Sequence, residues 1–220
     1  MEKKLLEIRE NVFMSFNIKR WIIFVLGINA LSIGIVFNTK SRLGVGSITT
    51  LPYVFSQITT ISLGNSITLL YFVFVLIQTI LLKKIDYKIL IQFPFSFIVG
   101  QLIDIYDLVI TTQANTLIIQ ISLLIIATFL TALGVYFMIK SDIVLNPSDG
   151  IVQTISQVFH QPFGKIKIPF DLSTIALSCL LSFVFIGSLV GVGIGTIINA
   201  LCIGYCVSLY DKILKIEFVR

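Results

Sequence analysis

The stretch LIIQISLLIIATFLTALGVYFMIK, residues 117–140, decides the fold class of this chain. No charged residue interrupts it before Lys140. A helix of about 20 apolar residues is long enough to cross the hydrocarbon core of a bilayer, which is about 30 Å thick. The stretch therefore predicts a transmembrane helix over 117–139.

Five further apolar runs of similar length predict five more transmembrane helices, over 21–38, 66–82, 90–110, 168–188 and 193–211. The whole chain has 220 residues, of which 56% are hydrophobic and only 12% charged. Soluble domains carry about 25% charged residues, and half that fraction cannot cover a soluble surface. Three cysteines, an odd number, are also too few for a secreted disulfide scaffold. We therefore expect an all-α polytopic membrane protein with six transmembrane helices.

Two shorter apolar segments, 47–61 and 147–160, are bounded by Gly, Pro, Ser and Asn. About 14 helical residues reach only about 21 Å at 1.5 Å per residue, which is too short to cross. Both segments are predicted to be re-entrant half-helices. The alternative is that they are interfacial helices that follow tight turns.

The two halves of the chain match each other in sequence. With an offset of 100 residues, seven positions in the first half have the same residue in the second half: Gly34, Phe37, Lys40, Ser41, Ser56, Gln57 and Gly64. With an offset of 104, Gly100, Tyr106 and Asp107 match Gly204, Tyr210 and Asp211. This register predicts two repeats of about 80–90 residues, 21–110 and 117–214, joined by a linker at 111–116. Residues 1–20 are predicted to form a basic amphipathic segment on the cytoplasmic surface, and 215–220 a cytoplasmic tail.

The distribution of basic residues selects between two topologies, because cytoplasmic loops are enriched in Lys and Arg. If the two short segments do not cross, 14 of the 16 Lys and Arg lie inside and only Lys40 and Arg42 lie outside. If they cross, Lys83, Lys84, Lys88 and Lys140 move outside, and the division becomes 10 against 6. The first topology is favoured, with both termini cytoplasmic. It has three spans in each unit, so the second repeat is inverted relative to the first, an architecture found in transporters.

The starts of the two short segments are the strongest candidates for a functional site. Asn146 suits an N-cap, Pro147 the first helical position, and Asp149 a position from which its carboxylate reaches back to the cap. Two helix N-termini that face each other near the bilayer midplane favour an anion or a carboxylate-bearing solute. Asp149 adds a negative charge there, so it either serves only as a cap or selects for a cation or a proton.

The candidate solute-binding residues are polar side chains at these two helix starts and around them. At the starts they are Ser47, Thr49, Thr50, Asn146, Ser148 and Asp149, and around them Gln57, Gln157 and Asp104. An Asp deep in the bilayer costs about 2.5–3.5 kcal/mol on insertion scales, so Asp104 is a functional candidate. It could equally form a hydrogen bond with a neighbouring helix. For Asp171 we predict a local ion pair with Lys165 or Lys167.

Two sets of residues carry a resemblance to a known family. Asp142, Pro147 and Asp149, with Leu43-Gly44 in the first half, are similar to the A-D-L-G-x-x-P-x-D stretch of the YczE/YitT-like bacterial membrane proteins, although Ile143-Val144 replaces its Leu-Gly. The glycine-rich run 191–196, followed by Gly204, is similar to the stretch that opens the family's last helix. The resemblance implies an integral protein of the bacterial inner membrane, usually regarded as a permease. It implies no particular substrate.

These observations predict a permease that moves a small polar or anionic solute between the two repeats. The alternative is a membrane scaffold or accessory subunit that binds a partner protein, and a homo-oligomer is also left open. We expect no enzymatic activity, no cofactor, no metal site and no nucleic-acid partner. The net charge of +5 lies in short clusters between apolar runs, as in loops that face anionic lipid. The glycines at 191, 193 and 195 follow no strand, so they do not form a dinucleotide-binding motif; close packing or a helix break explains them better.

Overall fold

The computed structural model describes residues 18–83 and 86–216, and all regular elements within them are helices. In chain order these are α2 (Ile18–Ser41), α3 (Ser47–Ile58), α4 (Leu63–Leu82), α5 (Tyr87–Leu90), α6 (Gln92–Val109), α7 (Leu117–Ser141), α8 (Pro147–Val158), α9 (Phe163–Ile186) and α10 (Ile194–Leu214). The predicted amphipathic segment lies outside the described residues, apart from its last three positions. The same holds for Lys84 and for the end of the predicted tail.

Six helices are long and apolar enough to cross a membrane, which confirms the predicted class and number of spans. They are α2, α4, the continuous run of α5 and α6, α7, α9 and α10. The predicted start of the fifth span, at residue 168, was wrong, because α9 begins at Phe163. The two lysines of its first turns do not end the helix, since Lys167 is paired with two carboxylates.

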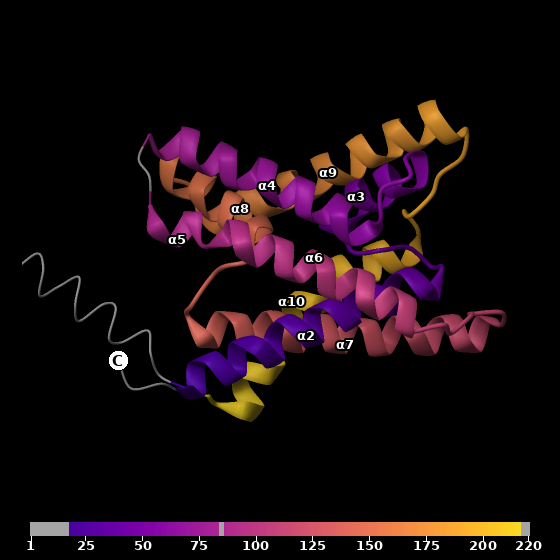
Figure 1. The fold of residues 1–220 in the computed structure, drawn as a ribbon, viewed down its shortest axis with the longest axis horizontal. Coiled ribbons are helices and arrows are strands. Elements are labelled where there is room, and N and C mark those ends of the chain that lie inside the picture. The colour runs from indigo at the N-terminus through magenta and orange to yellow at the C-terminus, as the bar shows by residue number, and fades with distance from the viewer. Residues whose placement is uncertain (1–17, 84–85, 217–220) are drawn as a thin grey trace, which may run out of the picture.

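Helices α2 and α7 pack against each other along most of their length and lie side by side in the lower part of Figure 1. Glycines allow this close approach. A Cβ on Gly134 would lie 2.5 Å from the backbone nitrogen of Leu31, and a Cβ on Gly27 would lie 3.1 Å from the Gly134 carbonyl oxygen. Small residues at helix contacts are typical of membrane bundles, where van der Waals packing takes the place of the hydrophobic effect.

The helix boundaries in the two halves follow the predicted offset of 100 residues. Helix α2 ends at Ser41 and α7 at Ser141, while α3 and α8 begin at Ser47 and Pro147. The residues that follow α2 and α7, Arg42 and Asp142, both have positive φ angles.

Two ion pairs repeat the same relation between the halves. Lys40 Nζ lies 2.7 Å from Asp107 Oδ1, and Lys140 Nζ lies 2.5 Å from Asp211 Oδ1. These are the Lys and Asp positions that the sequence offsets of 100 and 104 relate to one another.

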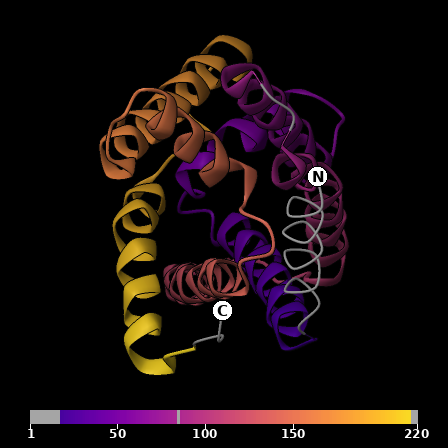
Figure 2. The ribbon, with the colours of Figure 1, turned by 90° about the vertical axis from the view of Figure 1, so that its left-hand side faces the viewer.

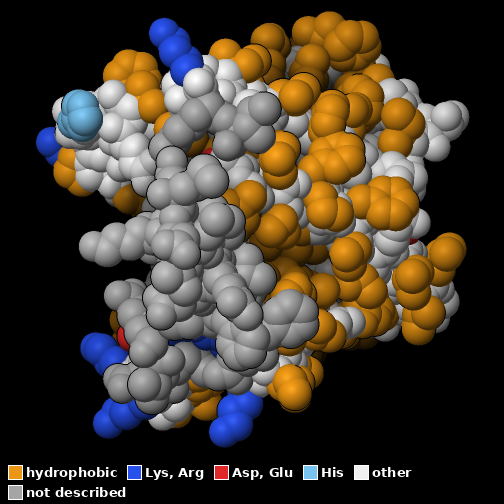
Figure 3. Space-filling model, turned by 60° about the vertical axis from the view of Figure 1, so that its left-hand side comes forward, with side chains coloured by type: hydrophobic (Ala, Val, Ile, Leu, Met, Phe, Trp, Pro, Cys, Tyr) orange, Lys and Arg blue, Asp and Glu red, His pale blue; other side chains and the backbone are white. Residues whose placement is uncertain are grey.

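The bundle has two chemically different ends and an apolar flank. One end, which we name the basic end, is where α2 begins and where α4, α7 and α10 finish; it faces the viewer in Figure 2. Its described basic residues are Lys19, Arg20, Lys83, Lys88, Lys140, Lys165, Lys167, Lys212 and Lys215. The opposite end carries Lys40 and Arg42. In Figure 3 hydrophobic side chains cover the flank and Lys and Arg side chains gather at its edge, as expected for a protein in a bilayer.

Candidate functional site

Three charged side chains meet where the start of α8 touches the first turns of α9. Lys167 Nζ lies 3.1 Å from Asp149 Oδ1 and 3.3 Å from Asp171 Oδ1. The three side chains are 27%, 29% and 19% exposed, respectively, so all are mostly enclosed. This group, which we name the charge cluster, contains two carboxylates and one ammonium. Its formal charge is therefore negative by one unit.

The start of α8 has the predicted cap but a different role for its acid. The Asn146 side chain accepts a hydrogen bond from the Ser148 backbone N–H, and Pro147 occupies the first position. The sequence predicted that the Asp149 carboxylate reaches back to the cap residue Asn146. In the structure this carboxylate accepts a hydrogen bond from Lys167 instead. An ammonium group is a stronger partner for a carboxylate than a neutral backbone N–H. The backbone of Asp149 is held by the Asn146 carbonyl.

The start of α3 reaches the same part of α9 from the other half of the chain. The Thr174 hydroxyl donates to the backbone carbonyl of Ser47 at 3.3 Å. The Ser47 side chain also lies beside the Asp171 carboxylate. Helix α3 has Gly46 as its N-cap, which offers no side-chain acceptor to the first turn. Both half-helix starts therefore contact α9 between Lys167 and Thr174.

Tyr71, on α4, completes the enclosure of the α8 start. Its side chain is 4% exposed and lies beside Asn146 and Ser148. Sequence reasoning missed both Tyr71 and Lys167 as site residues. The spacing of Lys167 and Asp171, one helical turn apart, gave the local ion pair, which is confirmed. It gave no signal for the longer contact with Asp149.

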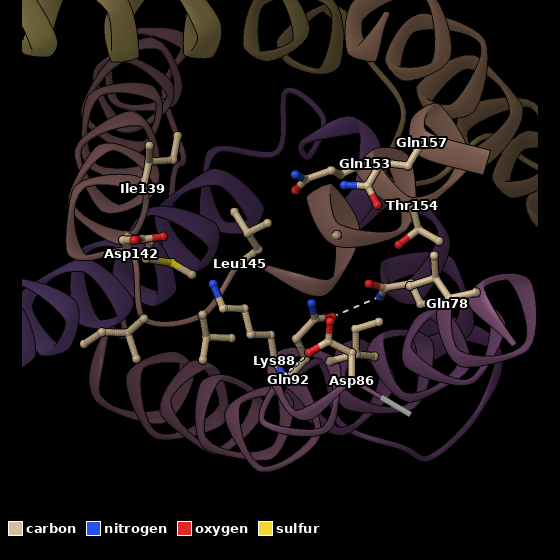
Figure 4. Close-up of a pocket in the computed structure, with 16 residues that line it drawn as sticks. Gln78, Asp86, Lys88, Gln92, Ile139, Asp142, Leu145, Gln153, Thr154 and Gln157 are labelled. Carbon is tan, nitrogen blue, oxygen red and sulfur yellow. Dashed lines mark hydrogen bonds between the residues drawn. The ribbon is translucent and has the colours of Figure 1, made fainter. Parts of the chain in front are cut away.

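A polar cavity of about 460 Å³ lies at the basic end, between α8, the ends of α4 and α7, and the start of α6. Its polar walls include four glutamines, Gln78, Gln92, Gln153 and Gln157, with Thr154 beside them (Figure 4). Asp86, Lys88 and Asp142 add charged groups to the lining.

At the inner wall of this cavity Gln78 Nε2 donates to Gln92 Oε1 at 3.0 Å, and both side chains are buried. Gly150 of α8 makes room for this pair, because a Cβ there would lie 2.8 Å from each amide. The cavity therefore begins one residue after Asp149 of the charge cluster. The glutamine side chains in its wall offer both hydrogen-bond donors and acceptors.

The structure brings together some of the predicted site residues. Ser47, Asn146, Ser148 and Asp149 all lie around the first turns of α9 or against Tyr71. Thr49 and Thr50 lie in the first turn of α3, where the buried Thr50 donates to the Ser47 carbonyl at 2.6 Å. Gln57 and Gln157 are exposed near the far ends of the half-helices. Of these two, Gln157 lines the cavity.

Asp104 lies away from this site, at the opposite end of the bundle. Its carboxylate accepts hydrogen bonds from the Ser62 hydroxyl at 2.6 Å and from the Gly64 backbone N–H at 2.8 Å. It therefore caps the start of α4, where the N-terminal dipole favours a negative charge. Of the two predicted roles, the structure supports the bond to a neighbouring helix.

Six long apolar helices that expose hydrophobic side chains on their flanks define a multi-pass integral membrane protein. Within the described ranges, no three His, Cys, Asp or Glu side chains gather as metal ligands.

Residues 18–212 match a family model described as Family of unknown function (DUF6198), and the chain belongs to this family. The match covers both halves of the chain. No curated protein and no solved structure matches it. The family's description does not name the YczE/YitT-like proteins, so that resemblance stays a prediction.

Proposed function

We propose that this protein is a permease that moves a small polar solute across a cell membrane, through a site between two inverted repeats. The observation that carries the proposal is the meeting of two half-length helices, one from each half, on one charged turn of α9. Transporters with inverted repeats bind their solutes at such broken helices near the midplane. The common helix boundaries and the two equivalent ion pairs support the repeat.

The proposed topology places the basic end in the cytoplasm of a bacterial cell. Apart from Lys167 of the charge cluster, eight described basic residues lie there, against two at the opposite end, which agrees with the positive-inside rule. Helices α3 and α8 then enter from opposite faces and return without crossing. The chain direction reverses between the halves, because each has three crossing helices.

The charge cluster favours an uncharged or cationic solute over an anionic one. Two helix N-termini alone would attract an anion. Here Asp149 and Asp171 share one ammonium, so one negative charge remains to offset the positive helix ends. We therefore narrow the sequence-based hypothesis of a polar or anionic solute to a polar one. The excess carboxylate can accept a proton or a cation during transport, and the polar cavity is the path to it from the basic end.

A ligand screen on the purified protein tests this proposal. Thermal unfolding would be measured against a panel of polar metabolites and monovalent cations for the natural protein and for Asp149→Asn. A solute at a hundred times its dissociation constant adds about 2.7 kcal/mol of stability. The account expects at least one stabilising solute whose effect is lost in Asp149→Asn.

Asp211→Asn is the matched control, because Asp211 pairs with a lysine outside the charge cluster. It should keep the full ligand response. A response that survives in Asp149→Asn and disappears in Asp211→Asn would contradict the proposed site. Silence across the panel, combined with a co-purifying protein, would favour the alternative function of a scaffold or accessory subunit.

A further inference from the structure

At the end of the bundle opposite the basic end, α4 and α6 are in close contact through two glycines. A Cβ on Gly64 would overlap the Gly100 carbonyl oxygen, and a Cβ on Gly100 would overlap the Thr68 hydroxyl. Asp104 of α6 holds the contact by capping α4 through Ser62 and Gly64. The start of α4 and the last turns of α6 are therefore closed against each other.

The equivalent residues of α9 and α10 are apart. Gly164 and Gly204 correspond to Gly64 and Gly100 by the offsets of 100 and 104, and a Cβ on either glycine would meet nothing within 4 Å. Ile168, the counterpart of Thr68, is 65% exposed. Ser208 takes the place of Asp104 and donates to the Gly204 carbonyl of its own helix. The start of α9 and the last turns of α10, at the basic end, are therefore open.

The loops show the same difference. At the opposite end the backbone N–H of Val45 donates to the Gly191 carbonyl at 2.8 Å, and that of Gly195 donates to the Leu43 carbonyl at 2.7 Å. Gly44, at φ +113°, allows this approach, because a Cβ there would lie 2.6 Å from the Gly193 nitrogen. The glycine-rich run thus stands at a break between α9 and α10 and packs closely against the loop after α2; the sequence had left a helix break and close helix packing open as explanations.

At the basic end the equivalent segments, 142–146 and 86–92, face the polar cavity instead. No backbone hydrogen bond joins them among those the structure describes outside regular helices. The helix contacts and the loop contacts thus agree: the bundle is closed at the opposite end and open at the basic end.

We propose that the protein alternates between this state and a mirrored one, in which α9 closes on α10 at Gly164, Ile168 and Gly204 while α4 and α6 separate. This inference rests on the proposed inverted repeat, since each half then adopts the arrangement now seen in the other. The cavity at the basic end closes in the mirrored state, and an equivalent path opens between 42–46 and 191–195. The charge cluster then faces each side of the membrane in turn.

A disulfide between positions 168 and 204 tests the mirrored state directly. The reference pair is Thr68→Cys with Gly100→Cys, whose side chains adjoin in the present state. The test pair is Ile168→Cys with Gly204→Cys, in a chain whose Cys179, Cys202 and Cys206 are serine. A disulfide needs a Cα–Cα distance below about 7 Å. We expect both pairs to oxidise within one chain in membranes, the test pair more slowly, because the mirrored state must first form.

The control pair joins Ile168→Cys to the natural Cys202, with the other two cysteines replaced. Cys202 lies two residues before Gly204, about 200° away around the helix, and should give at most a tenth of the yield of the test pair. Absence of the test disulfide, or equal yields in test and control pairs, would overturn the inference.

A disulfide formed only between two chains, seen as a dimer on a denaturing gel, would also overturn it and would assign the open α9–α10 surface to a second copy. The ligand screen with Asp149→Asn is independent of this experiment. A solute response that persists without the test disulfide therefore retains the proposed function and rejects the mirrored state.

Discussion

The helix pair of α4 and α6 and its counterpart, α9 and α10, have related sequences and different packing. The glycines that make the first contact, Gly64 and Gly100, recur at 164 and 204, but only the first two are covered. In the most apolar 18-residue stretch of each helix, 33% of the residues are buried in α4 and 39% in α5–α6. The corresponding shares are 17% in α9 and 11% in α10. A glycine therefore permits close helix contact without enforcing it.

The side chains that differ between the two pairs account for the contrast. Ser62 and Asp104 form a hydrogen-bonded cap across the first pair. Pro162 and Ser208 stand at the equivalent positions. A proline has no side-chain donor, and the Ser208 hydroxyl is used within its own helix. The charged cap thus joins α4 and α6 in one half only, and in the proposed alternation it favours the state seen here.

The largest expected effect comes from filling the covered glycine. Gly100→Ala places a Cβ against the Thr68 hydroxyl and the Gly64 backbone, and overpacking of this kind costs about 1–3 kcal/mol. Gly204→Ala, the matched variant, meets open space and should be neutral or stabilising by up to about 1 kcal/mol from helix propensity. Thermal unfolding in detergent measures both. Equal losses for the two variants would remove the contrast.

A somewhat smaller effect is expected from the charged cap. Asp104→Asn removes the charge from two hydrogen bonds at the start of α4, and a lost N-terminal cap costs about 0.5–2 kcal/mol. Because the closed end is weakened, the yield of the 168–204 disulfide should rise at least twofold. Ser208→Ala is the control and should leave both the unfolding temperature and the yield unchanged. A yield that falls in Asp104→Asn would contradict this role.

Introducing the Ser62–Asp104 cap at the equivalent positions of the second half should favour contact between α9 and α10. Pro162→Ser combined with Ser208→Asp reproduces the side chains of Ser62 and Asp104 at the start of α9. Replacing the cap residue with one that hydrogen bonds contributes about 1 kcal/mol, about a fivefold change in a population ratio, since 1.4 kcal/mol is tenfold. The disulfide yield should increase accordingly. An unchanged yield would show that residues outside these two positions hold α9 and α10 apart.

The smallest effects are expected where the two halves are alike. Lys40–Asp107 and Lys140–Asp211 have similar distances and exposure, and partly exposed ion pairs contribute about 0.2–1 kcal/mol. Asp107→Asn and Asp211→Asn should therefore destabilise the protein by similar, small amounts, which shrink further in high salt. A difference above about 1 kcal/mol would show that these ends are not equivalent.

Periodicity and charge predict the frame of this fold because both follow from the bilayer. Long uncharged runs such as 117–139 have to be helical to satisfy their backbone groups in lipid. The chain offsets of 100 and 104 predicted which positions of the two halves correspond, but not that Lys40 pairs with Asp107 and Lys140 with Asp211. The start of α9 was missed, because Lys165 and Lys167 lower the local hydropathy of a helix whose charges are neutralised elsewhere in the fold.

The candidate site was only partly predictable for a related reason. Asn146 and Pro147 act within their own turn, so their roles can be read from local sequence. The contacts of Asp149 and Asp104 join residues 18 and 42 positions away in the chain. Such contacts depend on how the helices pack, and single-sequence patterns contain no signal for them. Gln78 and Gln92, inside or beside apolar runs, were the detectable sign of a polar cavity.

The inverted repeat is the central claim, and the sidedness of one pair of equivalent positions tests it most directly. Ile61 and Gln161 both follow a half-helix, are both exposed, and differ by 100 residues. Each would be replaced by cysteine in a chain whose three natural cysteines are serine, and labelled in intact cells with a membrane-impermeant thiol reagent. The account predicts labelling of Ile61→Cys from outside and of Gln161→Cys only after permeabilisation. Labelling of both positions from the same side would contradict it.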